Sequence, residues 1–236
     1  MAKRNPYKGP DANTLRAKRD GYPARSVYKL EEIDRRVHLF RPGMNVLDLG
    51  ASPGSWSLYA LEKIGKAGKL LAVDLKPLDT VLPPSGTFLL GDARETAALS
   101  VHAPYDVVLS DMAPNTSGNR MADQARSFEL FMFALGVAGE HCKEGGAFVG
   151  KIFMGEDFTL ARTELKKLFA TEKIIRPEGT RSVSYEIFLV GQDRRKREPA
   201  KSCPRSPRRC CWGDGSSSSA RLGAGASASC TARSIR

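Results

Sequence analysis

The chain has 236 residues, a formal net charge of +11, and no continuous apolar run of the ~18 residues that a transmembrane helix requires. This length suits one α/β domain with extensions at its ends. The first residues, Met-Ala-Lys-Arg-Asn-Pro, are followed by no apolar segment, so we expect no secretory signal and a cytoplasmic location.

The positive charge is concentrated at the two ends of the chain. Residues 194–236 hold eleven Lys or Arg against two acidic residues, and residues 1–25 hold seven against two. Residues 26–193 therefore carry a net charge of −3. A basic end beside a site is typical of proteins with polyanionic substrates. The tail cysteines match no zinc-binding spacing, so no metal site is expected.

The composition divides the chain into three parts. Residues 1–24 predict a basic, extended N-terminal arm, and residues 25–192 predict one folded domain. Residues 193–236 are rich in Ser, Arg, Ala and Gly, and they hold too few apolar residues to fold alone. We therefore expect a disordered tail there.

Within the domain, helical and strand patterns alternate. A first helix is indicated from Val27 to Val37, with Ser26 as a possible cap. Strands are predicted at 45–50, 69–75, 87–90, 105–111 and 146–153, and helices at 55–64, 92–99, 124–142 and 159–169. Two further strands, 172–176 and 185–191, have only a short link between them, so they must be antiparallel. The pattern predicts a doubly wound, mostly parallel sheet with helices on both faces.

The segment 46–56, Val-Leu-Asp-Leu-Gly-Ala-Ser-Pro-Gly-Ser-Trp, predicts a strand, a tight turn and the start of a helix. A nucleotide-like ligand binds at such a turn in open α/β sheets. A dinucleotide site needs Gly-x-Gly-x-x-Gly, whereas here Gly50 and Gly54 enclose three residues and Pro53 removes one N–H donor. The spacing argues against a nicotinamide dehydrogenase and favours a nucleoside ligand that lacks phosphates.

Acidic residues stand at or near the ends of four predicted strands. They are Asp48, Asp74, Asp92 and Asp111. Each alone is most simply a turn or helix-capping residue. Together they predict a row of acceptors along the ligand edge of the sheet, with Asp74 suited to ribose hydroxyls and Asp92 to a base.

Two charged residues interrupt apolar strands. Lys151 lies within Ala-Phe-Val-Gly-Lys-Ile-Phe, and Glu186 lies within Tyr-Glu-Ile-Phe-Leu-Val. A charge in a core strand is costly unless it is paired or functional. A lysine at a sheet end can also extend its amine to water, but the additional carboxylate of Asp111 favours a functional role.

Five motifs together resemble one family. They are Arg25-Ser-Val-Tyr-Lys-Leu, Asp48-Leu-Gly-Ala-Ser-Pro-Gly-Ser-Trp, Ser110-Asp-Met-Ala-Pro-Asn, Lys151-Ile-Phe and Ser184-Tyr-Glu-Ile. In this order they resemble the FtsJ/RrmJ family of S-adenosylmethionine-dependent RNA 2′-O-ribose methyltransferases, from about Arg25 to Gly191. Ser52 and Ser55 depart from the small Ala and Gly that are usual there.

The resemblance implies a Rossmann-like class I methyltransferase fold with seven strands, the last of them antiparallel. It implies a catalytic tetrad, which is here Lys29, Asp111, Lys151 and Glu186, and we infer that Lys151 is the general base. It also implies S-adenosyl-L-methionine contacts at Gly54, Trp56, Asp74, Asp92 and Asp111, to which the turn analysis adds Gly50.

The resemblance implies methylation of a uridine in large-subunit (23S-type) ribosomal RNA, by an enzyme that we expect to be a monomer. Related members act on tRNA or on mRNA caps, so these substrates are the first alternative. A second alternative is a ribosome-assembly factor of the same fold without catalytic activity. The intact tetrad argues against the second alternative.

Overall fold

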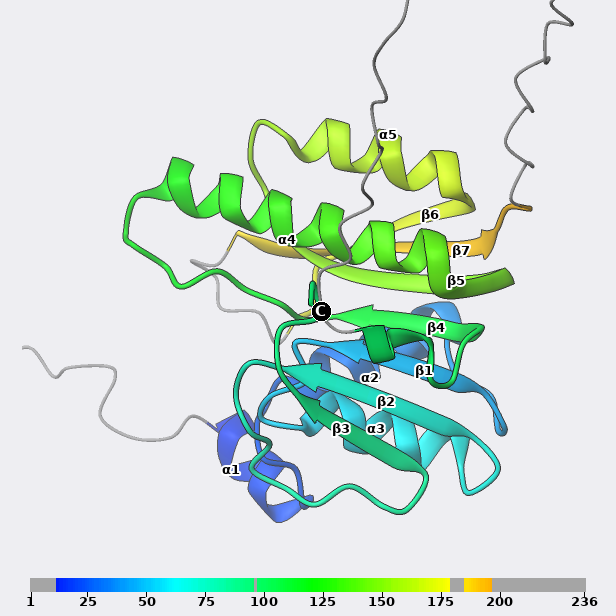
Figure 1. Cartoon of the computed structure of the whole chain (residues 1–236). Helices are drawn as coiled ribbons and strands as arrows, with labels where there is room; N and C mark the ends of the chain where they lie inside the picture. The colour runs from blue at the N-terminus through cyan, green and yellow to red at the C-terminus, as the bar shows by residue number, and fades with distance from the viewer. Residues whose placement is uncertain (1–11, 96, 179–184, 197–236) are drawn as a thin grey trace, which may run out of the picture. The chain divides into compact units, whose positions relative to one another are not determined.

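The computed structural model describes residues 12–95, 97–178 and 185–196. Seven strands in this part form one sheet in the order β3-β2-β1-β4-β5-β7-β6. Their bounds are β1 Asn45–Leu49, β2 Lys69–Asp74, β3 Gly86–Leu90, β4 Tyr105–Ser110, β5 Cys142–Phe153, β6 Phe169–Ile175 and β7 Glu186–Arg194. Only β7 runs against its neighbours, β5 and β6. This confirms the predicted mixed sheet with a reversed last strand (Figure 1).

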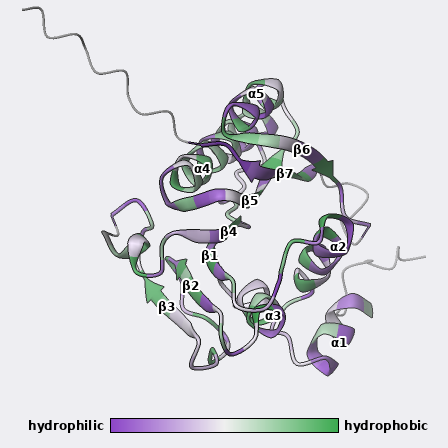
Figure 2. Cartoon of the chain, turned by 90° about the vertical axis from the view of Figure 1, so that its right-hand side faces the viewer, coloured by the Kyte–Doolittle hydropathy of each residue, from purple (hydrophilic) through white to green (hydrophobic). Residues whose placement is uncertain are grey.

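Helices cover both faces of the sheet. They are α1 (Ala12–Arg19), α2 (Val27–Val37), α3 (Ser55–Ile64), α4 (Arg120–His141) and α5 (Phe158–Leu168). α2 and α3 lie on one face, and α4 and α5 lie on the other (Figure 1). Hydrophobic and hydrophilic residues alternate along these helices, as amphipathic packing requires (Figure 2). No helix in the described part of the chain is long and apolar enough to cross a bilayer.

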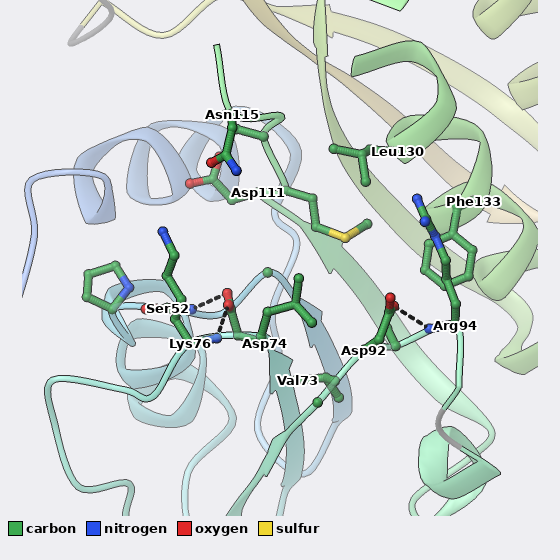
Figure 3. Close-up of a pocket in the computed structure, with 17 residues that line it drawn as sticks. Ser52, Val73, Asp74, Lys76, Asp92, Arg94, Asp111, Asn115, Leu130 and Phe133 are labelled. Carbon is green, nitrogen blue, oxygen red and sulfur yellow. Dashed lines mark hydrogen bonds between the residues drawn. The ribbon is translucent and has the colours of Figure 1, made fainter. Parts of the chain in front are cut away.

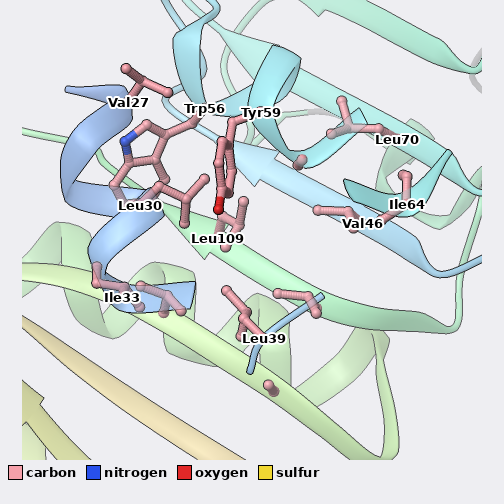
Figure 4. Close-up of a cluster of buried hydrophobic side chains, with 14 of the residues drawn as sticks. Val27, Leu30, Ile33, Leu39, Val46, Trp56, Tyr59, Ile64, Leu70 and Leu109 are labelled. Atoms are coloured by element: carbon pink, nitrogen blue, oxygen red, sulfur yellow. The ribbon is translucent and has the colours of Figure 1, made fainter. Parts of the chain in front are cut away.

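The α2/α3 face contains one of two hydrophobic cores in the described part of the chain, and Trp56 belongs to it beside Val27 and Leu30 of α2 (Figure 4). The Trp56 ring packs against Phe188 of β7 with centroids 5.5 Å apart. Its indole N–H donates to the carbonyl of Ser26 at 2.9 Å, directly before α2. Trp56 therefore fixes the start of α2 against the sheet, and α2 carries Lys29.

The reversed direction of β7 decides which residues meet at one end of the sheet. Lys151 of β5 pairs with Phe188, and Phe153 pairs with Glu186. Directly opposed residues share a face, so Lys151 and Glu186 are diagonal neighbours on the same face. Val149, two residues before Lys151, belongs to the α2/α3 core and identifies that face.

The N-terminal segment differs from the prediction of an extended arm. Residues 12–19 form helix α1, while residues 1–11 lie outside the described part of the chain. The helix is short, but its Ala17 is fully buried and the Arg16 guanidinium lies 4.2 Å from the centre of the Tyr28 ring. Tertiary contacts with α2 stabilise a segment whose own periodicity is too weak to reveal a helix.

The helix predicted at 92–99 is also wrong. The structure has only a short 3₁₀ helix there, η1 (Ala97–Ser100). The Asp92 carboxylate accepts a hydrogen bond from the backbone N–H of Arg94 at 2.9 Å, which makes a turn in place of a first helical turn.

Some helices and strands are longer than the sequence predicted, because capping or strand pairing extends them. α4 begins at Arg120 because the Asn119 side chain accepts from the N–H groups of Met121 and Ala122. β5 and β6 begin earlier than predicted, at Cys142 and Phe169. β7 continues to Arg194, past the predicted boundary at 192, while the rest of the predicted tail from residue 197 lies outside the described residues.

Two buried aspartates have opposite electrostatic environments. Asp48 lies fully buried in β1, where burial raises its pKa to about 7, although the Ser57 hydroxyl donates to it at 2.6 Å. Its other oxygen has no hydrogen-bond partner within the described residues. Asp123 in α4 accepts from the backbone N–H and the hydroxyl of Ser117, and these hydrogen bonds lower its pKa. Asp48 is thus a structural residue of β1 and does not join the predicted row of ligand acceptors.

Two glycine substitutions test the packing of α4 on β5. A methyl group at Gly150 would stand 2.6 Å from the Phe148 ring and 2.8 Å from the Phe131 ring, so Gly150→Ala should cost about 1–3 kcal/mol of unfolding free energy. Gly136, on the exposed side of α4, has open space around it, and Gly136→Ala should stabilise the protein by about 0.5–1 kcal/mol. Denaturant unfolding measures both. Equal effects of the two substitutions would contradict this packing.

The pKa of Asp48 predicts a pH-dependent stability. Its folded-state pKa of about 7 exceeds the ordinary carboxyl value of 3.8, so the folded chain binds more protons and loses stability as pH rises from about 4 to about 7. Asp48→Asn removes this titration. The unfolding free energy of the variant relative to wild type should therefore rise by about 2 kcal/mol between pH 5 and pH 8.

The matched control for this experiment is Asp123→Asn. The lowered pKa of Asp123 keeps that carboxyl ionised throughout the range from pH 5 to pH 8, so its variant should differ from wild type by a constant amount. Parallel stability curves for wild type and Asp48→Asn would refute the raised pKa of Asp48.

Candidate active site

A cavity of about 550 Å³ opens at the carboxyl ends of β1, β2, β3 and β4 (Figure 3). This volume is within the range of small-molecule sites. Its lining combines carboxylates with apolar and aromatic side chains. The lining residues are Gly50, Ser52, Pro53, Val73, Asp74, Leu75, Lys76, Gly91, Asp92, Ala93, Arg94, Asp111, Met112, Ala113, Asn115, Leu130 and Phe133.

Asp74, at the end of β2, connects the glycine turn to the next strand. One carboxylate oxygen accepts from the backbone N–H of Ser52 at 2.9 Å, and the other accepts from Lys76 N–H at 2.8 Å (Figure 3). Each oxygen has a second lone pair, so the carboxylate can still accept from a ligand's hydroxyl groups. Asp74 therefore fills the turn role and keeps the capacity for the ligand role, which stays a prediction.

Asp92 and an aromatic wall form the opposite side of the cavity. The Arg94 guanidinium lies 5.7 Å from the centre of the Phe133 ring, and Leu130 lines the same wall from α4 (Figure 3). A flat, apolar wall beside a carboxylate suits a nucleobase with an exocyclic amino group. The periodicity of α4 identified its core face and gave no signal for Phe133 or Leu130, which face the cavity.

The turn at Gly50 depends on a close backbone approach. Gly50 has a φ of +78°, and a Cβ there would lie 2.7 Å from Met112 Cγ and 2.9 Å from the backbone nitrogen of Met112. Met112 directly follows Asp111. Gly50 therefore lets the turn after β1 contact the loop after β4, and any side chain at position 50 would displace that loop.

Two residues that were predicted to contact the cofactor lie elsewhere. Gly54 is not among the cavity-lining residues, and a Cβ there would meet Thr80 at 2.7 Å. Trp56 is also absent from the lining, and its side chain is buried in the α2/α3 core. Contacts of these two residues with a cofactor stay predictions.

Lys151 and Asp111 form the first of two ion pairs near the cavity. The Lys151 ammonium donates to the Asp111 carboxylate at 2.9 Å and to the Asp111 backbone carbonyl at 2.5 Å. The Lys151 side chain is only 6% exposed, whereas that of Asp111 is 19% exposed. Asp111 follows β4, whose Ser110 pairs with Gly150, so the sheet register places these two residues together.

Lys29 and Glu186 form the second pair. The Lys29 ammonium donates to a Glu186 carboxylate oxygen, and both side chains are largely buried. The ammonium also lies 6.0 Å from the centre of the Phe188 ring, opposite Lys151. The structure thus places the four residues of the predicted tetrad in two ion pairs on the α2/α3 face of the sheet. Two positive and two negative groups balance, which reduces the cost of burying them.

Hydrogen bonds with residues in the first turns of α4 hold the loop between β4 and α4 in place. The Asp123 carboxylate holds Ser117 through two hydrogen bonds of 2.9 Å, as described above. The Arg126 guanidinium donates to the Asn115 carbonyl at 3.5 Å. Asn115 lines the cavity and lies four residues after Asp111. The sequence placed Asn115 in a motif but gave no reason to assign it to the cavity.

Comparison with known proteins finds relatives that match most of the chain. A family model described as FtsJ-like methyltransferase matches residues 22–194. The chain is 62% identical over 194 residues to the ribosomal RNA large subunit methyltransferase E of Sorangium cellulosum, covering 81% of this chain and 92% of that protein. It is 52% identical over 182 residues to the protein of that name from Oleidesulfovibrio alaskensis, covering 75% and 88%.

Solved structures agree with the fold. A protein described as a ribosomal RNA methyltransferase from Plasmodium falciparum is 27% identical with a TM-score of 0.62, covering 73% of this chain and 98% of that one. Fibrillarin from Aeropyrum pernix, solved with natively bound S-adenosyl-L-methionine, is 15% identical with a TM-score of 0.51, covering 70% and 76%. This second likeness concerns the fold alone. The sheet, the cavity and the match over residues 22–194 lead to one conclusion: this chain belongs to the FtsJ-like methyltransferase family.

Proposed function

We propose that this protein transfers a methyl group from S-adenosyl-L-methionine to the 2′-hydroxyl of a uridine ribose in large-subunit ribosomal RNA. Membership of the methyltransferase family supports the reaction type. The printed names of the two relatives support the RNA of the large ribosomal subunit as substrate.

The position of Asp111 is the observation that carries the proposal. Asp111 lines the cavity, and it also accepts two hydrogen bonds from the Lys151 ammonium. One residue therefore connects a nucleoside-sized cavity to a buried amine. Methyl transfer requires this adjacency, because the attacking oxygen must reach a bound donor and also lose its proton.

The cavity residues fit S-adenosyl-L-methionine. Asp74 would accept from the ribose hydroxyls, while Asp92 and the Phe133 wall would hold the adenine. The close approach of Gly50 to Met112 would hold the methionine part beside Asp111. When bound, the cofactor supplies a methyl group on a positively charged sulfur.

The tetrad residues would orient the ribose and accept its proton. Lys151, as the neutral amine, is the proposed base that takes the proton of the 2′-hydroxyl. Asp111 uses two oxygen atoms to fix the direction of the Lys151 amine. Lys29 and Glu186, on the same sheet face, would hold the hydroxyl and the ribose through hydrogen bonds. We further propose a monomer that acts in the cytoplasm.

Labelled S-adenosyl-L-methionine tests the substrate. Purified large ribosomal subunits, protein-free ribosomal RNA, tRNA and capped mRNA are each incubated with the enzyme. Alkali-resistant label in the large-subunit RNA is expected, since 2′-O-methylation blocks cleavage at that ribose. Label confined to tRNA or to the cap would overturn the choice of substrate. Tight subunit binding without any label would favour the assembly factor.

Lys151→Ala tests the assignment of the base. Removal of a general base should lower kcat by about 100-fold or more, while the dissociation constant of the cofactor, measured by calorimetry, stays close to wild type. Lys143→Ala is the matched control, because Lys143 belongs to the same strand and pairs with Asp106 near its other end. That pair lies at the end of the strand away from the tetrad, so it should contribute little to activity. Near-normal turnover by Lys151→Ala would refute the assignment.

A further inference from the structure

An aromatic cluster lies where β5 ends and β7 begins. The rings of Phe153 and Tyr185 meet edge to face, with centroids 5.2 Å apart. The guanidinium of Arg120, from the first residue of α4, lies 5.1 Å from the centre of the Tyr185 ring. Three separate segments therefore converge on one aromatic-and-cationic surface, which we call the Tyr185 platform (Phe153, Tyr185 and Arg120).

The platform adjoins the tetrad through the sheet register. Phe153 is the direct cross-strand partner of Glu186, and Tyr185 is the residue immediately before Glu186. Phe153 also stands two residues after Lys151 on the same strand face. Opposed residues in such a pair have Cβ atoms about 5 Å apart. Only Phe153 shares the face of the tetrad, whereas Arg120 comes from α4 on the other face and meets the cluster through Tyr185. The platform therefore stands at the strand ends, where a base attached to a ribose at the tetrad would contact it.

The side chains of the platform are accessible to solvent in part. Phe153 and Tyr185 are only partly buried, and Arg120 is exposed. Two methionines next to them in sequence are also exposed, Met121 by 72% and Met154 by 46%. The surface beside the tetrad therefore combines two partly exposed rings with exposed, polarisable methionines, a combination typical of sites that bind flat ligands.

The position of Arg120 is not explained by helix stability. A cation in the first turn of a helix faces the positive end of the helix dipole and destabilises it slightly. α4 is already capped by the Asn119 side chain, which accepts from two backbone N–H groups. The guanidinium instead lies over the Tyr185 ring, where it can contact both a stacked base and its phosphate.

We infer that the Tyr185 platform receives the nucleobase of the target nucleotide, with Tyr185 as the stacking ring and Arg120 as the contact to the adjacent phosphate. This inference rests on the proposed function, because it assumes that the ribose of an RNA nucleotide occupies the tetrad. A base can reach the platform only from an unpaired or extruded nucleotide, since a paired base is covered by its neighbours in the helix. An aromatic ring can stack on any of the four bases, so the platform would select for an accessible nucleotide. Other contacts would have to distinguish uridine from the other nucleotides.

Substitution of Tyr185 tests the stacking. Tyr185→Leu should weaken the affinity for protein-free large-subunit RNA by about 5- to 150-fold, as expected for the loss of one base–aromatic stack. Tyr185→Phe, which keeps the ring, should bind RNA like wild type. Filter binding measures the RNA affinity, and calorimetry should find the cofactor affinity unchanged in both variants.

Phe40→Leu is the matched control. Phe40 also forms an edge-to-face ring pair, with Tyr59 at 6.1 Å, but it precedes the amino end of β1, whereas the platform lies at the carboxyl end of β5. Its variant should keep the RNA affinity of wild type. Arg120→Ala adds an independent measurement. The loss of one phosphate contact should reduce the salt dependence of binding by about one unit of slope, which a purely structural role would not do.

The outcomes separate this inference from the proposed function. Wild-type RNA affinity in a folded Tyr185→Leu variant, together with an unchanged salt slope for Arg120→Ala, would overturn the platform even if methyl transfer occurs. A wild-type enzyme that places no label in any RNA would overturn the proposed function. If Tyr185→Leu fails to fold, Tyr185→Trp replaces it: the larger ring should bind RNA at least as tightly as wild type, and weaker binding would contradict stacking.

Discussion

A lysine ammonium buried in the interior of the sheet is the constraint on which the rest of this site depends. Lys151 is almost fully enclosed, and an unpaired charge at such a position would cost several kcal/mol. Asp111 reduces this cost, because its carboxylate and its backbone carbonyl both accept hydrogen bonds from the Lys151 ammonium. This contact requires β4 to end directly beside β5. The pairing of β4 with β5, the length of β4 and the start of the following loop are all tied to this contact.

The contact between Lys151 and Asp111 also connects the cavity to the tetrad. On one side, Asp111 continues into Met112, whose backbone lies against Gly50, so consecutive residues join the cavity wall to the ion pair. On the other side, β7 and α2 bring Glu186 and Lys29 to the same sheet face. Trp56 links these elements, because it packs on β7 and holds the residue before α2. A residue in the hydrophobic core thus determines the position of a charged group in the site.

Much of this architecture was predictable from local patterns. Alternating strands and helices predicted the parallel sheet, and the short link before residue 185 predicted the reversed strand, because both features depend on chain connectivity. The charges at Lys151 and Glu186 were visible as exceptions in apolar strands. Burial was harder to predict. Asp48 has the same sequence context as Asp74, yet it lies inside β1 while Asp74 lies at a strand end. Helix α1 and the cavity role of Phe133 depend on tertiary neighbours, which no local pattern encodes.

The position of the reversed strand β7 determines when, during folding, the charged residues can meet. Lys29 and Glu186 are 157 positions apart in the chain, and β7 takes its place between β5 and β6, two strands made before it. During synthesis the cofactor cavity, built from β1 to β4 and α4, can form while β7 is still missing. The tetrad closes only when β7 enters the gap in the sheet. The ion pair between Lys29 and Glu186 can therefore form only after the end of the domain has been synthesised, and a chain that lacks β7 has no carboxylate beside Lys29 from this strand.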